Sequence, residues 1–202
     1  MNDAAPPVSL TAARASVALF LGAPLLLLAL VVALRVGEVH EGVHRVQRRI
    51  LLHERLAAPI ARQEGVELSL ILAVAACESG GRADAVSPAG AVGLMQLMEG
   101  TAVELAGGGR PDRLDPETSL RLGARYLREQ LDRFAAYPCG EELALAAYNA
   151  GPGRVKKWLA ERPLQADRER LGAWIPFRET RNYVRRVAAW RERWELELES
   201  SR

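Results

Sequence analysis

The stretch Val66–Gly81, VELSLILAVAACESGG, decides the fold of this chain. From Val66 to Cys77 it is apolar almost all the way round a helix, which is typical of a helix buried in a domain core. The two glycines at its end stop the helix, so Glu78 is predicted in the last turn. The helix dipole and low-dielectric surroundings there disfavour the charged carboxyl, which raises its pKa toward that of a general acid. A solvated glutamate fits the same position.

Ahead of this helix, the 202-residue chain begins with an apolar segment. Residues 15–34 (ASVALFLGAPLLLLALVVAL) carry no charge, and their number suits a hydrocarbon core about 30 Å thick. We expect a retained transmembrane signal anchor rather than a cleaved signal peptide, whose apolar region usually has about 7–15 residues. Residues 1–14 then form an N-terminal tail. Residues 35–56 form a helical stalk, which either packs on the domain or begins a coiled coil.

Composition excludes several classes of function. The net charge is +2 and acidic and basic residues alternate, so nucleic acid is not an expected partner. All three histidines precede the domain, which disfavours Ser-His-Asp, Cys-His and most zinc chemistry. Cys77 and Cys139 have no CxxC spacing and are either free thiols or one disulfide. We expect no metal and no cofactor.

Three segments follow the Glu78-Ser79 pair in order: residues 87–98 (SPAGAVGLMQLM), 146–153 (AAYNAGPG) and 175–184 (IPFRETRNYV). Together these segments resemble the lytic transglycosylase family of the soluble, goose-lysozyme-like type. The resemblance runs from about Pro59 to Trp190. Each segment alone is a weak signal, whereas four in order at plausible spacing are strong evidence.

This resemblance implies an all-α, lysozyme-like domain at residues 57–195, followed by a C-terminal tail at 196–202. It also implies cleavage of the β-1,4 bond between N-acetylmuramic acid and N-acetylglucosamine in peptidoglycan. Glu78 matches the family's single catalytic acid/base. Six residues match positions that bind or orient the substrate: Ser87, Gln96, Met98, Tyr148, Glu179 and Tyr183.

The resemblance also gives these residues separate roles. Ser87 matches a hydroxyl that contacts the muramyl N-acetyl group, and Gln96 and Met98, expected at the start of a helix reaching Gly107, match residues that line the glycan cleft. Tyr148 matches a tyrosine whose hydroxyl orients the glutamate. Glu179 and Tyr183 match the family's late Glu-Thr…Tyr-Val element. Ser79 is expected to form a hydrogen bond at the end of its helix.

Glu179 and Gly81 each carry a further expectation. For Glu179, a buried ion pair with a nearby arginine is favoured over proton transfer. Where the family commonly has an aromatic residue after Glu-Ser-Gly, this chain has Gly81-Arg82. We therefore expect one wall of the glycan cleft to differ.

A single glutamate is sufficient for substrate-assisted cleavage. The muramyl N-acetyl oxygen stabilises the oxocarbenium-like centre while Glu78 protonates the leaving oxygen. The Glu78 carboxylate then takes the proton of the C6 hydroxyl, which closes to a 1,6-anhydromuramoyl end. Two alternatives remain: a hydrolytic muramidase on the same fold, and a catalytically silent glycan-binding scaffold.

The expected location follows from the substrate. Peptidoglycan lies outside the cytoplasmic membrane, so we expect a single-pass inner-membrane protein with its catalytic domain on the periplasmic or outer face. The flanking charges favour the opposite orientation, because Arg14 alone precedes the span and four arginines follow it: Arg35, Arg45, Arg48 and Arg49. We base the expected orientation on the position of the substrate, since the effect of flanking charge on orientation is only a tendency.

Overall fold

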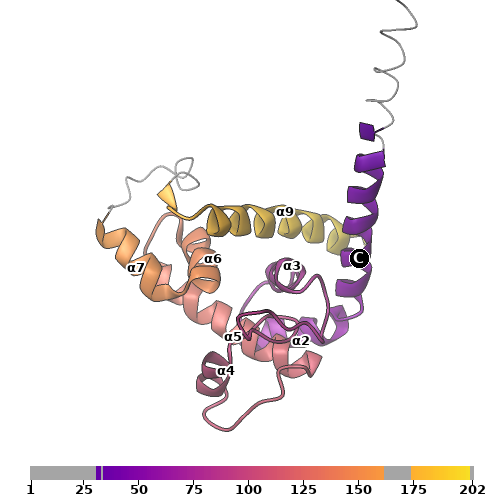
Figure 1. Ribbon diagram of the computed structural model, residues 1–202. Helices are drawn as coiled ribbons and strands as arrows, with labels where there is room; N and C mark the ends of the chain where they lie inside the picture. Colours follow the sequence, from indigo (N-terminus) through magenta and orange to yellow (C-terminus); the bar gives the residue numbers. More distant parts are fainter. Residues whose placement is uncertain (1–30, 33, 162–173, 201–202) are drawn as a thin grey trace, which may run out of the picture. The chain divides into compact units, whose positions relative to one another are not determined.

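The computed structural model describes residues 31–32, 34–161 and 174–200 (Figure 1). These residues form helices joined by turns and loops, which confirms the all-α prediction; their only β pairing is two isolated bridges, Val86 with Val92 and Val92 with Leu97. The chain divides into two compact units, residues 1–45 and 46–202.

In the first unit, residues 34–45 are helical, and Val36 and Val39 on this helix are exposed. The expected membrane segment at 15–34 lies almost entirely outside the described residues. Within the part of the chain that the structure describes, no helix combines the length and the apolar character that a membrane crossing requires.

The second unit contains the labelled helices. They are α2 (Glu54–Glu64), α3 (Leu68–Glu78), α4 (Glu99–Leu105), α5 (Pro116–Phe134), α6 (Gly140–Ala150), α7 (Pro152–Glu161) and α9 (Arg178–Ser200). Figure 1 shows α9, in yellow, crossing over α3 and α6, and both helices pack against it. On the other side of the unit, α5 packs against α2 and α6.

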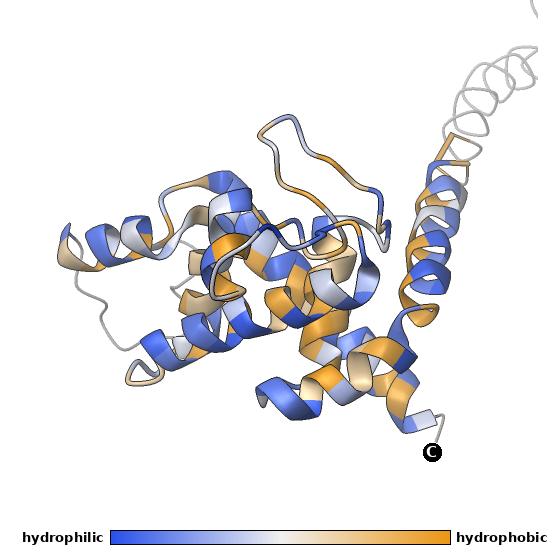
Figure 2. Cartoon of the chain, turned by 90° about the horizontal axis from the view of Figure 1, so that it is seen from below, coloured by the Kyte–Doolittle hydropathy of each residue, from blue (hydrophilic) through white to orange (hydrophobic). Residues whose placement is uncertain are grey.

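Helix α3 is the centre of the core. Every residue from Ser69 to Ala76 is buried, as predicted from a segment that is apolar all round. Leu70, Ile71 and Leu72 are at most 2% exposed, and burying a side chain of this size contributes roughly 1.5–3 kcal/mol. Hydrophobic residues gather where the helices of this unit meet, as Figure 2 shows in orange.

Helix α5 forms as its sequence predicts. The Asp115 side chain accepts a hydrogen bond from the Thr118 backbone N–H at 2.8 Å, and Pro116 occupies the first turn. Apolar residues spaced three or four apart form its buried face: Leu120, Ala124, Leu127 and Phe134. This helix is a rigid support for the loop that follows α3.

That loop, residues 79–98, differs from the prediction at its end. Helix α4 begins at Glu99 with Met98 as its N-cap and ends at Leu105, so Gln96 precedes the helix. Gln96 has φ 48°, a left-handed conformation, and its side-chain Nε2 donates to the carbonyls of Ala85 and Gly93 at 3.0 and 2.9 Å. Met98 lies at the helix start as predicted, whereas the prediction for Gln96 was wrong, because its side chain donates to loop carbonyls instead.

Arg191 connects three elements of the second unit. Its guanidinium donates to Glu141 at 2.6 Å, to Glu195 at 2.8 Å, and to Glu67. These carboxylates belong to the first turn of α6, to α9 itself and to the N-cap of α3. The Arg191 side chain is 22% exposed, so solvent screens this network less than it screens a surface pair.

The loop and α5 make a close contact that a mutation can test. A Cβ atom built on Gly123, in the middle of α5, lies 2.4 Å from Met95 Cβ and 2.5 Å from its Cγ. We predict that Gly123→Ala lowers the free energy of unfolding of the full-length chain by about 1–3 kcal/mol, because Met95 is buried and has no room to move. Denaturant unfolding measures the change.

Gly100→Ala is the matched control. Gly100 is also helical, and a Cβ atom there meets nothing within 4 Å. Alanine is the better helix former by about 0.5–1 kcal/mol, so this variant is expected to be at least as stable as the unaltered chain. Equal stability of the two variants would contradict the predicted overpacking at Met95.

Candidate active site

Glu78 is the last residue of α3 and leads into a tight turn. Ser79 caps the helix, and Gly80 and Gly81 follow with φ 63° and 77°. The Ser79 hydroxyl donates to the Ala75 carbonyl at 3.2 Å and accepts from the Gly81 N–H at 3.2 Å. This confirms that Ser79 hydrogen-bonds at the helix end, and it fixes the backbone from which the Glu78 side chain projects.

The environment of Glu78 raises its pKa from the ordinary value of 4.5 to about 7. Loss of hydration on burial is the main cause, and it outweighs the contact with the Tyr183 hydroxyl and the charge of Arg186, which both lower the pKa. The residue as a whole is half-buried. Both protonation states of the carboxyl are thus accessible near neutral pH, which suits a group that first donates and then accepts a proton.

Two buried tyrosines lie next to Glu78. The Tyr183 hydroxyl faces the carboxyl, and the charge of Glu78 and burial hold the pKa of Tyr183 well above its usual value. This contact is looser than a standard hydrogen bond, since the hydroxyl has no partner of normal geometry among the described residues. Such contacts at catalytic groups often tighten only when substrate binds.

Tyr148 acts on the loop rather than donating to Glu78. Its hydroxyl donates to the Met95 carbonyl at 2.9 Å, and the Met95 N–H donates to Ser119 Oγ on α5 at 3.1 Å. Glu78 is close enough to raise the Tyr148 pKa. The structure therefore brings both predicted tyrosines to the glutamate, and it is Tyr183 whose hydroxyl faces the carboxyl.

The other predicted residues lie on the loop or at the surface. Ser87 is half-buried and accepts a hydrogen bond from the Ala91 N–H at 3.0 Å, while the Gln96 amide donates to loop carbonyls. Met98 is 47% exposed. Glu179 is exposed in the first turn of α9, so the buried ion pair expected for it was wrong.

Sequence reasoning missed Arg186, whose positive charge lowers the pKa of both Glu78 and Cys77. Arg186 follows Tyr183 by three residues on α9, and residues at this spacing share one face of a helix. The helical spacing of Tyr183 and Arg186 could therefore have predicted that Arg186 lies near the site. Cys77 is a free thiol, so the alternative of one disulfide was wrong, and burial raises the pKa of Cys77 to about 12.

The segment 46–53 covers the turn that follows Glu78. A Cβ atom on Gly81 would lie 2.7 Å from Arg49 Cβ, and His53 Nε2 is 3.3 Å from the Gly81 carbonyl oxygen. Ile50 is completely buried. This close approach explains the departure noted at Gly81, because a side chain at this position would displace the backbone of the covering segment.

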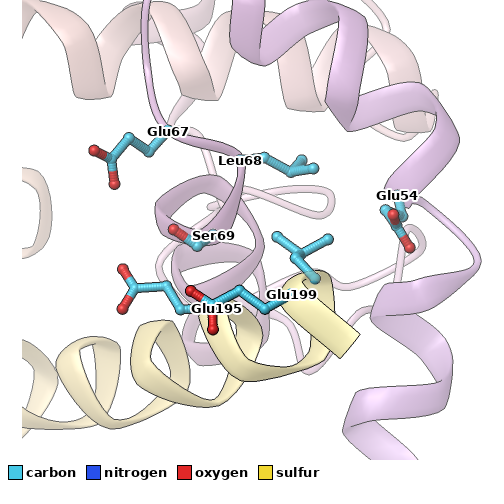
Figure 3. Close-up of a pocket in the computed structure, with 7 residues that line it drawn as sticks. Glu54, Glu67, Leu68, Ser69, Glu195 and Glu199 are labelled. Atoms are coloured by element: carbon cyan, nitrogen blue, oxygen red, sulfur yellow. The ribbon is translucent and has the colours of Figure 1, made fainter. Parts of the chain in front are cut away.

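A separate hollow of about 500 Å³ lies at the opposite end of α3 (Figure 3). Its acidic residues come from three elements: Glu54 of α2, Glu67 at the start of α3, and Glu195 and Glu199 of α9. Glu67 and Glu195 both pair with Arg191. The hollow therefore belongs to the ion-pair network that joins the helices.

Comparison with known proteins agrees with the geometry of the site. The family described as Transglycosylase SLT domain matches residues 55–171. The soluble lytic murein transglycosylase of Salmonella typhimurium is 36% identical over 154 residues, which are 73% of this chain and 23% of the relative. The membrane-bound lytic murein transglycosylase F of Pseudomonas fluorescens is 38% identical over 113 residues, 54% of this chain and 23% of that protein.

Solved structures give the same result. An inactive Glu-to-Gln mutant of the lytic transglycosylase Slt from Pseudomonas aeruginosa has a TM-score of 0.66 and 36% identity, covering 73% of this chain and 24% of that one. A 70-kDa soluble lytic transglycosylase in complex with bulgecin A has a TM-score of 0.69 and 33% identity, over 77% and 26%. The chain thus spans about a quarter of the length of these relatives.

The raised pKa of Glu78 predicts a pH-dependent cost in stability. Between pH 4.5 and about 7 the folded state holds more protons than the unfolded chain, so stability falls as the pH rises through this window. Glutamine is neutral throughout. We expect Glu78→Gln to raise the free energy of unfolding at pH 8 by about 2 kcal/mol and at pH 5 by much less.

Thermal or denaturant unfolding of both chains at pH 5, 6 and 8 measures this gain. Glu129→Gln, which removes an exposed carboxyl on α5, is the control and is expected to show no such rise. A gain for Glu78→Gln of the same size at pH 5 and pH 8 would rule out the raised pKa.

Proposed function

The chain belongs to the transglycosylase SLT domain family, and on this premise we propose that it cleaves the β-1,4 bond between N-acetylmuramic acid and N-acetylglucosamine in peptidoglycan, leaving 1,6-anhydromuramoyl ends. The observation that carries the proposal is the position of Glu78. It ends a buried helix, faces a buried tyrosine hydroxyl and has a pKa of about 7. The names of the relatives, lytic murein transglycosylases, support the same reaction.

The proposed reaction uses both protonation states of Glu78. In its neutral form the carboxyl donates a proton to the departing glycosidic oxygen, while the muramyl N-acetyl oxygen stabilises the positive charge at C1. In its charged form it accepts the proton of the C6 hydroxyl, whose oxygen then bonds to C1. A pKa near neutral pH keeps both transfers accessible in one cycle.

The neighbouring residues support the two steps. Tyr183 and Arg186 stabilise the carboxylate that forms after the first transfer. Ser87 is proposed to contact the N-acetyl group, and Gln96 and Met98 are proposed to line the glycan cleft. Two further residues remain in the proposed set in supporting roles: Tyr148, which holds the loop through Met95, and Glu179, exposed at the start of α9.

We also propose that residues 15–34 anchor the chain in the cytoplasmic membrane with the domain on its outer face. The uncharged run of these residues and the existence of relatives named membrane-bound support this location. A reporter fused after Arg202 is expected to be active only on the outer side of the membrane. Activity on the cytoplasmic side would overturn the orientation.

Replacing the proposed acid tests the function. We expect Glu78→Gln to reduce the release of soluble fragments from purified peptidoglycan at least 100-fold, on the order of the contribution of a general acid. Glu129→Gln is the matched control and is expected to keep full activity. Mass spectrometry of the fragments from the unaltered chain is expected to find 1,6-anhydromuramoyl ends.

Three outcomes would change the proposal. Reducing ends in place of anhydro ends would make the chain a muramidase. Binding without release of fragments would make it a glycan-binding scaffold. Full activity of Glu78→Gln would remove Glu78 from the reaction.

The pH profile tests the contact between Tyr183 and Glu78. The first step needs neutral Glu78, so the cleavage rate is expected to fall as the pH rises through about 7. Tyr183→Phe removes the hydroxyl whose contact with the carboxyl lowers the Glu78 pKa, so the falling limb should move to higher pH. Tyr126→Phe, which removes a hydroxyl next to Tyr148, is the control. A limb that stays in place in Tyr183→Phe would contradict the contact.

A further inference from the structure

We propose that a second hollow, which we name the aromatic-basic hollow, binds the acidic peptide stems that peptidoglycan carries on its muramyl residues. It has a volume of about 360 Å³ and is lined by Arg154, Lys157, Trp158, Glu161, Pro176 and Phe177. The choice of ligand rests on the proposed function. The hollow itself is independent of it, since none of these six residues was among the predicted site residues.

The floor of the hollow is aromatic and rigid. Trp158 is 6% exposed and packs against Trp174 at a ring-centroid distance of 6.4 Å, edge to face. Phe177 lies 5.5 Å from Trp158, tilted by 36°, and keeps 56% of its surface exposed. One ring is therefore fixed in the core and holds a second ring open to a ligand.

The rim of the hollow is positively charged. Arg154 and Lys157 are exposed on α7, one helical turn apart. Lys157 Nζ lies 3.7 Å from Glu161 Oε1, and both side chains are more than half exposed, so this pair is weak and leaves Lys157 free to exchange partners. Two cations against one carboxylate favour an anionic ligand. The chain's only lysines, Lys156 and Lys157, both lie on this helix.

An acidic peptide fits this combination better than a neutral sugar or a membrane. Carboxylates pair with guanidinium and ammonium groups, and the apolar parts of a peptide pack on an aromatic floor. An uncharged sugar has no use for the two cations. A membrane-binding surface presents several projecting aromatic side chains, whereas here Phe177 is the one exposed aromatic ring of the lining and Trp158 is buried.

The chain connects the hollow directly to the two helices that carry the tyrosines of the candidate active site. Phe177 accepts the backbone hydrogen bond of Arg181 at 3.0 Å and so leads directly into α9. Tyr183 follows six residues later, about 9 Å along a helix axis. On the other side, α7 begins two residues after the end of α6, the helix that carries Tyr148. The proposal therefore places in this hollow the peptide stem of a muramyl residue that is bound at Glu78.

The test compares binding to two forms of the same polymer. All variants are made in the full-length chain that carries Glu78→Gln, so that binding is measured without cleavage. The probes are glycan strands with their peptide stems and strands from which an amidase has removed the stems. Arg154→Gln/Lys157→Gln removes both cations, and Lys156→Gln, a neighbouring α7 lysine outside the hollow, is the control.

We expect the double variant to lower the ratio of affinities, stem-bearing over stripped strands, about three- to tenfold, on the scale of two solvent-exposed charge contacts. The control is expected to keep the original ratio. Because both residues are exposed, thermal unfolding of the double variant should be unchanged. An unchanged ratio, or equal loss for both strands, would overturn the proposal.

Two further arms separate this proposal from its alternatives. Membrane contact is tested by comparing binding to anionic and to neutral vesicles, since the apolar residues 15–34 contribute to both: if the double variant loses the preference for anionic vesicles and keeps the affinity ratio, the hollow is a lipid contact and the proposal fails. Cleavage by the chain with Glu78 intact tests the proposed function. Absence of cleavage with a lowered ratio would refute only the function, and cleavage with an unchanged ratio would refute only the peptide site.

Discussion

Glu78 ends a helix whose preceding residues are buried on every side, and its carboxyl loses hydration that no neighbouring charge fully replaces. This loss outweighs the contact with the Tyr183 hydroxyl and the charge of Arg186, so the pKa stays near 7. The burial that stabilises the core around α3 thereby destabilises the charged form of its last residue. Burial of the charged Glu78 carboxyl therefore lowers the stability of the fold locally, and such a loss of stability is typical of a functional site.

The rest of the domain holds that residue in place. The loop after α3 is anchored at Met95, whose N–H bonds to Ser119 on α5 and whose carbonyl accepts from Tyr148 on α6. Arg191 connects α9, which carries Tyr183, to the other end of α3 through Glu67. Each connection restricts how far Glu78 can move relative to the hydroxyl that it faces, which is how a scaffold preorganises a single acid/base.

The sequence predicted those features that depend on local pattern. The buried helix and Glu78 in its last turn follow from periodicity and helix-end signals, and the structure confirms them. Prediction from the sequence failed for features that depend on contacts between distant segments. The left-handed backbone at Gln96, the exposure of Glu179 and the segment 46–53 over Gly81 are set by tertiary packing that no local pattern records. The family resemblance supplied the candidate site residues that periodicity alone could not.

The most direct measurement is the titration of the Glu78 carboxyl in the intact chain, followed by carbon NMR and assigned by the signal that Glu78→Gln removes. Desolvation at the end of α3 predicts a midpoint at a pH of about 7. A midpoint near the ordinary value of 4.5 would show that the carboxyl is hydrated in the folded protein, and would contradict the account of Glu78 as a neutral-pH acid.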